Sequence, residues 1–415
     1  MMAQFRIGRR GLLGAGAALG TTAFLPAHLG AVVPYKLPPA ISSAERLDRL
    51  ARARALMAAN GIGAILIEPG ASLDYFTGVR WSRSERLTAA LIPATGDPII
   101  VTPFFEKPSV AESLAIPAEI RTWDEHEEPL KLVAGWLRER GLTSSPFGIE
   151  ETNRFFIVDR LKAALPALNM VNANAVVRGC RMIKSPAEIA LMRAAADITV
   201  SAIRATHPRI RPGMTPDVIS NMLETAMVKS GGTNPWALVL LGEASAYPHG
   251  TGKPQAVKRG EVILIDTGCA VRGYQADVSR SFVFGADPSP EQRRVWNHVA
   301  EGQKIANSAA RIGATAGSVD DSVRAAYTQW GYGPGYKLPG LSHRTGHGIG
   351  MEGHEPVNLV HGEETRLAPG MCFSNEPGIY LPGKFGIRLE DCFYMTATGP
   401  RWLSVPPPSI DRPLG

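Results

Sequence analysis

Two carboxylates, Asp266 and Asp277, stand in the segment EVILIDTGCAVRGYQADVSRSF at residues 261–282. If the two apolar runs of this segment pair as a hairpin around a two-residue turn at Val271 and Arg272, Asp266 lies opposite Asp277. Directly opposed side chains have Cβ atoms about 5 Å apart, and carboxylates that close repel each other unless a cation lies between them. The segment therefore indicates either a divalent metal site or a polar hairpin tip with two solvated acids.

A second pair of acids, Glu376 and Glu390, repeats this arrangement in the segment CFSNEPGIYLPGKFGIRLED. A three-residue turn at residues 382–384 would place Glu376 opposite Glu390. Histidines cluster in the preceding segment LSHRTGHGIGMEGHEP, residues 341–356, where His347 can supply a nitrogen ligand. Each hairpin would then present two carboxylates on one face, with an imidazole beside them.

The charges of these side chains indicate how many metal ions they would hold. Four carboxylates carry four negative charges, which two divalent cations balance. Two metals roughly 3.5–4 Å apart can clamp both sides of a hydrolytic displacement. Oxygen-rich ligands with one imidazole suit manganese, iron or cobalt and do not exclude zinc. The predicted metal ligands are Asp266, Asp277, His347, Glu376 and Glu390.

The order Asp, Asp, His, Glu, Glu resembles the dinuclear M24 metallopeptidases of the pita-bread fold, which include methionine aminopeptidase, aminopeptidase P and prolidase. DTGCAVRGYQADVSRSF resembles their paired-Asp hairpin, HRTGHGIGMEGHE the proline-peptidase signature, and NEPGIY and GIRLED the two Glu segments. RMIKSPAEIALMRAA is similar to the creatinase and prolidase branch, as is a first domain with DYFTG and IEE. One position departs, because Gly353 stands where a β-branched residue is usual. We expect this to loosen the local strand without removing a ligand.

The resemblance implies roles for further residues. His249 and His354 would face the substrate, holding its carbonyl or the tetrahedral oxyanion, and His343 would flank the substrate pocket. Arg388 would orient ligands from outside the metal shell. Glu376 would also act as the proton shuttle from the attacking water to the leaving amine. Each has a structural alternative: His249 as a loop residue, His354 in a surface pair, and Arg388 in a strand ion pair.

The resemblance implies an α/β (α+β) protein, with a pita-bread catalytic domain preceded by a smaller creatinase-like mixed α/β N-terminal domain. We expect five parts: a twin-arginine-type signal at 1–30, a linker at 31–43, the N-terminal domain at 44–180, the catalytic domain at 181–405 and a Pro-rich tail at 406–415. Ser185, Pro186 and Glu188 form a helix-start signature at the opening of the catalytic domain.

The implied reaction is dinuclear metal-dependent hydrolysis of a peptide bond near a free N-terminus, at Xaa-Pro, of the aminopeptidase P or prolidase type. A metal-bridging hydroxide would be the nucleophile, manganese the first choice of metal, and a homodimer the expected assembly. The same scaffold also suits a creatinase-like C–N hydrolase, a small-molecule lyase or a non-catalytic binding module. Creatinase-like chemistry predicts lost ligands, and a binding module has no need of four clustered carboxylates.

Charge and the first thirty residues bear on partners and location. The formal net charge is +6, and three of those positives are Arg6, Arg9 and Arg10, so the remainder carries +3 (6 minus 3). That value is too small and too dispersed to indicate nucleic acid or a membrane surface as a partner. The adjacent arginines and the mildly apolar run after them are typical of a twin-arginine signal. We therefore expect a periplasmic protein without stable membrane insertion after signal removal.

The four cysteines are scattered along the chain and have no CxxC spacing. This pattern favours neither a thiolate zinc site nor a disulfide framework. Most stand in apolar, strand-like segments and are expected to be buried thiols. They are Cys180, Cys269, Cys372 and Cys392.

Overall fold

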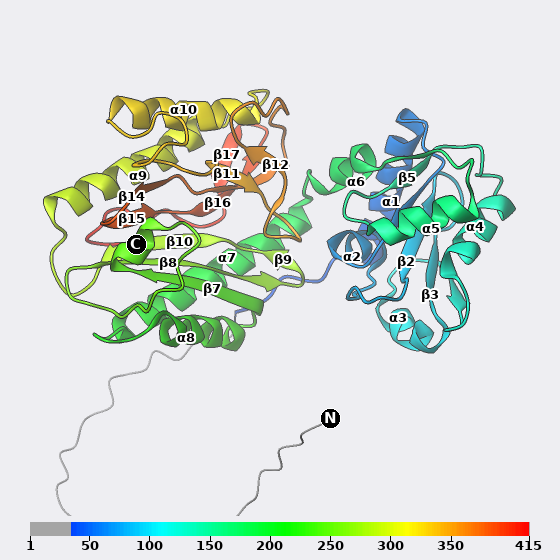
Figure 1. Ribbon diagram of the computed structural model, residues 1–415, viewed down its shortest axis with the longest axis horizontal. Helices are drawn as coiled ribbons and strands as arrows, with labels where there is room; N and C mark the ends of the chain where they lie inside the picture. The colour runs from blue at the N-terminus through cyan, green and yellow to red at the C-terminus, as the bar shows by residue number, and fades with distance from the viewer. Residues whose placement is uncertain (1–34, 415) are drawn as a thin grey trace, which may run out of the picture. The chain divides into compact units, whose positions relative to one another are not determined.

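The structure is a computed structural model that describes residues 35–414 (Figure 1). The predicted signal and the first residues of the predicted linker lie outside these residues, so export stays a prediction. Buried apolar side chains from Leu50 to Cys180 form cores separate from those formed by Leu191 to Ile410. Two domains follow from this separation, and each contains both helices and strands, as predicted.

The N-terminal domain is a six-stranded sheet with helices packed against it, in the order β4-β3-β2-β1-β5-β6 (Figure 1). Strands β2 and β3 pair antiparallel, with Leu91 opposite Ile99. The elements are α1 (Ser43–Ala59), β1 (Ala64–Ile67), α2 (Ala71–Thr77), β2 (Ala89–Pro93), β3 (Ile99–Pro103), η1 (Phe104–Glu106), α3 (Lys107–Ser113), β4 (Glu119–Trp123), α4 (Pro129–Glu139), β5 (Phe147–Ile149), α5 (Phe155–Ala164), β6 (Met170–Asn172) and α6 (Asn174–Arg181).

The catalytic domain combines three small sheets with helices, and its elements alternate less regularly along the chain. They are α7 (Pro186–Thr206), η2 (His207–Arg209), α8 (Pro216–Lys229), β7 (Thr233–Leu241), η3 (Gly242–Ala246), β8 (Val262–Val271), β9 (Tyr274–Gln275), β10 (Val278–Val283), α9 (Pro290–Ala309), α10 (Ala316–Gln329), β11 (Gly346–Gly348), β12 (Glu355–Leu359), β13 (Cys372–Asn375), β14 (Gly378–Leu381), β15 (Phe385–Arg388), β16 (Asp391–Thr396) and β17 (Gly399–Trp402).

The three sheets lie between two helix pairs (Figure 1). One sheet has the order β10-β8-β7, with β9 paired to β8, and packs against α7 and α8. The second has the order β12-β11-β13-β16-β17, and the third is the hairpin β14-β15. Helices α9 and α10 pack against each other on the side of these strands. The candidate ligands stand on strands or strand ends between the two helix layers.

Helix α7 begins where the sequence predicts it. Ser185 accepts a hydrogen bond from the Glu188 amide, and the Glu188 side chain accepts from the Ser185 amide, so the capping box is complete. Pro186 occupies the first helical position, where its missing N–H costs nothing. The buried face of the helix packs on β8, the strand that carries Asp266.

The predicted register of the Asp hairpin is wrong by one pair. The turn lies at Arg272 and Gly273, where both residues have positive φ, rather than at Val271 and Arg272. Asp266 therefore pairs with Ser279, and Asp277 is its diagonal neighbour on the same face. Glycine at 273 favours this turn because it adopts φ +90° without strain.

The predicted register of the Glu hairpin is confirmed. Leu381 pairs with Phe385 around the three-residue turn at 382–384. The same alignment continues below the acids, where Asn375 pairs with Asp391. Glu376 and Glu390 stand between these two paired segments, and their backbones are opposite each other.

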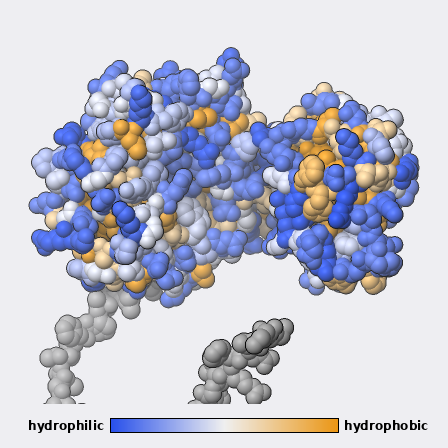
Figure 2. Space-filling model, viewed as in Figure 1, coloured by the Kyte–Doolittle hydropathy of each residue, from blue (hydrophilic) through white to orange (hydrophobic). Residues whose placement is uncertain are grey.

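All four cysteines are buried and free, which confirms the prediction of buried thiols that the sequence supported for most of them. Within residues 35–414, no helix combines the length and the apolarity needed to cross a membrane. On the face drawn in Figure 2, apolar residues are interspersed with hydrophilic ones over both domains. Exposed phenylalanines of the N-terminal domain include Phe104, Phe105 and Phe155.

Substitution of Gly268 would test the close packing of the Asp hairpin. A Cβ at this position would lie 2.0 Å from the Ala276 carbonyl oxygen, so Gly268→Ala should cost about 1–3 kcal/mol of unfolding free energy or more. Gly353→Ala is the matched control, because a Cβ there has no heavy atom within 4 Å. Urea unfolding would measure both, and equal stability of the two variants would contradict the hairpin geometry.

Candidate metal centre

The five predicted ligands converge on one place in the catalytic domain. One ligand atom from each of Asp266, Asp277 and Glu390 lies within 4.8 Å of the others, and the same holds for His347, Glu376 and Glu390. His347 Nε2 lies 3.3 Å from Glu376 Oε1 and 3.8 Å from Asp277 Oδ2. Glu390 belongs to both groups, so the five side chains form one continuous cluster.

The cluster contains buried oxygens that the protein itself does not satisfy. Asp277 Oδ1 and Glu390 Oε1 are buried and have no hydrogen-bond partner among the described residues. Buried polar atoms in proteins are nearly always paired, and a buried carboxylate is costly unless a cation neutralises it. Divalent cations would satisfy these oxygens, so the residues present fit a pair of metal ions.

Burial and mutual repulsion disturb the acids of the cluster. Burial and the neighbouring Asp266 and Glu376 raise the pKa of Asp277 well above its ordinary value. Burial and Asp277 raise the pKa of Glu390 in the same way. Burial raises the pKa of Glu376 to about 7, although Arg388 opposes the change. Without metal the cluster therefore tends to retain protons that metal binding would displace.

His347 is prepared as a ligand by its hydrogen bonds. Its Nδ1 lies 3.0 Å from the Gly348 carbonyl oxygen, which fixes the proton on Nδ1 and leaves the Nε2 lone pair facing the carboxylates. Burial lowers the pKa of His347 to about 3, so the ring is neutral, as metal binding requires. Its backbone amide donates to Ser374 Oγ at 3.0 Å.

Arg388 and Ser279 hold the oxygens from outside the cluster. Arg388 Nη2 donates to Asp266 Oδ2 at 2.6 Å, as expected of a ligand-orienting arginine. Ser279 Oγ lies 3.0 Å from Asp266 Oδ1 and 2.9 Å from Glu390 Oε2, and it also accepts from Arg388 Nε. Sequence reasoning missed Ser279, although its position two residues after Asp277 places both side chains on one strand face.

His343 is held by internal partners. Its Nδ1 lies 2.8 Å from the Arg344 carbonyl oxygen and its Nε2 lies 2.8 Å from the Tyr380 hydroxyl. The same hydroxyl accepts from Arg388 Nη1 at 3.0 Å. Both ring nitrogens of His343 are thus engaged within the protein, and its predicted contact with substrate stays a prediction. Tyr380, which the sequence analysis did not single out, joins His343 to Arg388.

His354 and His249 are both exposed, and His354 lies beside the cluster. His354 lies with His347 and Asp277 in a third group of ligand atoms within 4.8 Å, and its ring centroid is 4.1 Å from that of His347. Arg344 Nη2 contacts His354 Nδ1 at 3.2 Å. His249 is exposed and lines a hollow of about 650 Å³ bordered by β7 and the start of α8. Both histidines can be reached from solvent, as substrate-facing groups must be.

Helix α10 supports the segment that leads to His347. Asp320 is fully buried and accepts from the backbone and side chain of Thr345 at 3.0 and 2.7 Å. Arg324, paired with Asp320, donates to the carbonyls of Leu341 and His343. No spacing in the sequence links these helix residues to the cluster, so only the fold reveals them.

Comparison with known proteins agrees with this site. Residues 190–397 match the sequence model of metallopeptidase family M24, and residues 49–183 match the creatinase/prolidase N-terminal domain. The chain belongs to metallopeptidase family M24. The match to the family spans all five clustered ligand candidates.

The chain is similar to both dipeptidases and an aminopeptidase. It is 32% identical to the probable dipeptidase PepE of Mycobacterium tuberculosis, over 85% of this chain and 92% of that protein. It is 29% identical to the Xaa-Pro dipeptidase of Pyrococcus furiosus, over 87% and 97%. Among solved structures, PepE from Mycobacterium ulcerans matches with a TM-score of 0.80 at 32% identity, covering 90% of this chain and 99% of that one. The X-Pro aminopeptidase from Thermotoga maritima matches with 0.76 at 30% identity, covering 87% and 98%.

These similarities confirm the predicted fold class and the predicted kind of enzyme. The protein has a pita-bread catalytic domain that follows a creatinase-like N-terminal domain, and it is a peptidase of metallopeptidase family M24. Peptidases of this family depend on two metal ions. At Gly353, where the sequence departs from the usual pattern, a Cβ would meet no atom within 4 Å, so the space for a larger side chain is present.

Metal-free protein should lose unfolding free energy as the pH rises from about 5 to 8. The folded-state pKa of Glu376 is raised to about 7 from an ordinary 4.5. Its contribution to stability is therefore complete below 4.5 and is lost as the pH rises through 7. Urea unfolding of chelator-treated protein would measure the slope. Glu376→Gln should reduce it, whereas Glu112→Gln on exposed α3 should not; equal slopes in the two variants would contradict this account.

Proposed function

We propose that the protein hydrolyses the bond between an N-terminal residue and a following proline, with two divalent metal ions bound by the five clustered ligands. The observation that carries the proposal is the convergence of four carboxylates and His347. Two oxygens of these carboxylates, Asp277 Oδ1 and Glu390 Oε1, are buried and have no hydrogen-bond partner among the described residues. The similar proteins named as Xaa-Pro dipeptidases and an X-Pro aminopeptidase support the choice of substrate. A tertiary amide has no N–H, so a proline site needs no acceptor at that position.

Each side chain near the cluster has a task in this proposal. When bound, the metal ions supply a water activated at neutral pH and polarise the scissile carbonyl. Glu376 accepts the proton of the attacking water and delivers it to the leaving amine. His354 and His249 donate to the carbonyl oxygen as it gains charge. Arg388 keeps Asp266 oriented throughout.

Manganese is our proposed metal, with cobalt, iron and zinc as alternatives. The ligands offer carboxylate oxygens and one imidazole, a set that suits manganese and lacks the thiolates that favour zinc. Metal analysis of protein reconstituted with each ion, followed by activity measurement, would rank them.

Export to the periplasm and assembly as a homodimer are also proposed. Export rests on the paired arginines and apolar run within residues 1–30, and the dimer rests on resemblance to the family. A fusion of residues 1–35 to a reporter should appear in the periplasm. Sedimentation of the mature protein should give twice the mass of one chain.

Metal-loaded protein should cleave Xaa-Pro dipeptides, longer Xaa-Pro peptides, or both. A series from two to six residues, compared with Xaa-Ala peptides of equal length, would separate a dipeptidase from an aminopeptidase. The peptides should release the free N-terminal amino acid. Lack of cleavage of every proline peptide by fully metallated protein would overturn the proposed function and favour a lyase or C–N hydrolase.

Removing a ligand should remove both metal and turnover. Asp277→Ala and Glu376→Ala should each lower kcat at least about a hundredfold and reduce the bound metal, because both side chains belong to the convergent cluster. Asp321→Ala is a suitable control, because Asp321 is exposed and pairs with His361 on the surface. Metal content by atomic emission and kcat on an Xaa-Pro substrate are the readouts. Wild-type activity in either ligand variant would show that the assignment is wrong.

A further inference from the structure

Glu355 directly follows His354, and its carboxylate is buried between two basic side chains of the segment that joins the domains. Arg181 Nη2 lies 2.5 Å from Glu355 Oε1, and Lys184 Nζ lies 2.9 Å from Oε2. The exposed fractions of the three side chains are 3%, 12% and 2% for Glu355, Arg181 and Lys184. A surface pair of His354 with Glu355 was only the structural alternative to a substrate-facing His354, and Glu355 is instead a buried acid paired with Arg181 and Lys184.

The same carboxylate also binds backbone amides of the loop that precedes His354. Glu355 Oε1 accepts from the backbone amides of Met351 and Glu352 at 2.9 and 3.2 Å. A Cβ at Gly350 would lie 2.7 Å from Lys184 Cε and 2.8 Å from Glu355 Oε2. Glycine at 350 therefore lets the loop backbone approach the ion pair, and the loop is fixed at both ends.

Burial would by itself raise the pKa of Glu355, but Lys184 and Arg181 outweigh it and lower the pKa to about 2. The carboxylate is therefore charged, and the cost of burying it is offset by two cations and two amides. A buried ion that loses one partner leaves the others uncompensated. The loop accordingly has one strongly preferred position.

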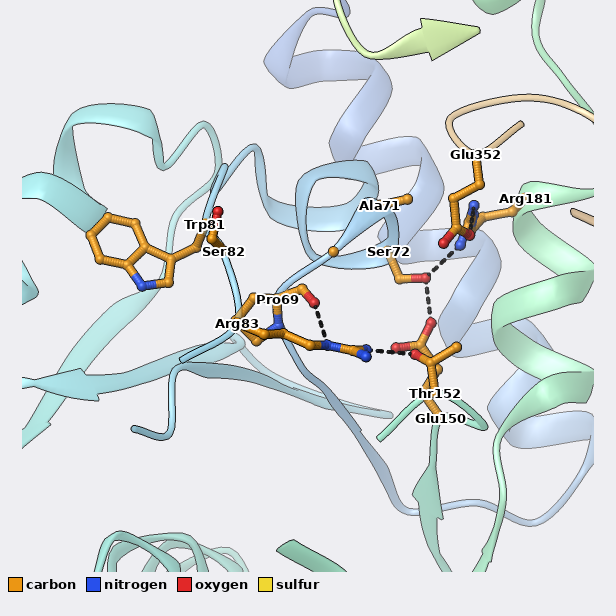
Figure 3. Close-up of a pocket in the computed structure, with 11 residues that line it drawn as sticks. Pro69, Ala71, Ser72, Trp81, Ser82, Arg83, Glu150, Thr152, Arg181 and Glu352 are labelled. Carbon is orange, nitrogen blue, oxygen red and sulfur yellow. Dashed lines mark hydrogen bonds and ion pairs between the residues drawn. The ribbon is translucent and has the colours of Figure 1, made fainter. Parts of the chain in front are cut away.

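Arg181 is the last residue of α6 and also binds α2 of the same N-terminal domain. Its Nη1 donates to Ser72 Oγ at 2.9 Å, and Ser72 in turn donates to Glu150. Figure 3 shows Arg181 between Ser72 and Glu352, beside a pocket that also includes Arg83 and Thr152. Glu352 contacts the same guanidinium at 2.7 Å but is 49% exposed. One arginine therefore connects α2 of the N-terminal domain to the loop that carries His354.

We propose that Glu355 is a positioning residue that holds His354 against the metal cluster through its bonds to Arg181, Lys184 and the loop amides. His354 itself is exposed, and within residues 35–414 the one side chain that forms a hydrogen bond with it is the long, partly exposed Arg344, so the backbone largely sets the position of its ring. The inference rests on the proposed function only in the role it gives His354. A shift of about 1 Å in a catalytic group can cost about a hundredfold in rate.

Glu355→Gln and Glu355→Asp test the proposal, with Glu352→Gln as the matched control on the same arginine. Glu355→Asp keeps the charge but is one methylene shorter, so it remains informative if Glu355→Gln does not fold. Both variants should lower kcat about 10- to 100-fold with metal content unchanged. Glu352→Gln should keep a near wild-type kcat, because exposed ion pairs contribute little. Equal losses in Glu352→Gln and the Glu355 variants would overturn the proposal.

A double-variant cycle separates positioning from general damage. If Glu355 acts through His354, adding Glu355→Asp to His354→Ala should cause little further loss of kcat. If the two losses multiply, the residues act independently and the proposal is wrong.

A readout without turnover distinguishes this inference from the proposed function. In the metal-free protein, the imidazole NMR signals of His354, assigned by their loss in His354→Ala, should move in Glu355→Asp and stay in place in Glu352→Gln. Unmoved His354 signals in Glu355→Asp would overturn the positioning role even if the enzyme is active. If the signals move while wild-type protein cleaves no proline peptide, the proposed function fails and the positioning of His354 stands.

Discussion

Four carboxylates gathered in a space a few ångströms wide repel one another, and much of the catalytic domain is arranged to withstand that repulsion. Arg388 is the one cation in direct contact with the ligand oxygens among residues 35–414, through Asp266. Ser279 bridges Asp266 and Glu390, but Asp277 Oδ1 and Glu390 Oε1 have no hydrogen-bond partner in the described part of the chain. In a medium that screens poorly, such charges shift toward their protonated forms or recruit cations. The fold thus carries an electrostatic cost that bound metal would remove.

The fold tolerates this cost because contacts away from the cluster hold in place the backbone segments that carry the ligands. The Asp hairpin packs against α7 through the opposite face of β8. The Glu strands extend two antiparallel pairs in a common register. The His347 segment is held by Asp320 of α10, a helix far from the hairpins in sequence. Each pair of ligands is therefore supplied by a separate structural unit, and only their packing brings the units together.

Prediction from the sequence was most accurate where distinctive ligand residues stand on strands whose register is set by a short turn. The five ligands are distinctive residue types in order, and a three-residue turn sets the alignment of Glu376 and Glu390 correctly. The Asp hairpin was misaligned by one pair, although Gly273, which adopts positive φ without strain, favours the observed turn at Arg272 and Gly273. Tyr380 and Asp320 were missed for another reason. Their roles depend on contacts between distant elements, which local spacing does not encode.

The two faces of strand β8 have different roles. Ile263, Ile265 and Cys269 pack into the core beneath α7 and α8, whereas Asp266 faces the carboxylates. Because neighbouring side chains on a strand point in opposite directions, the acid can be exchanged without disturbing the residues that stabilise the domain. Asp266 can therefore be substituted in evolution while the core-facing residues of this strand are retained. A descendant that lost the metal ligands would still keep the apolar face of β8 that packs into the core.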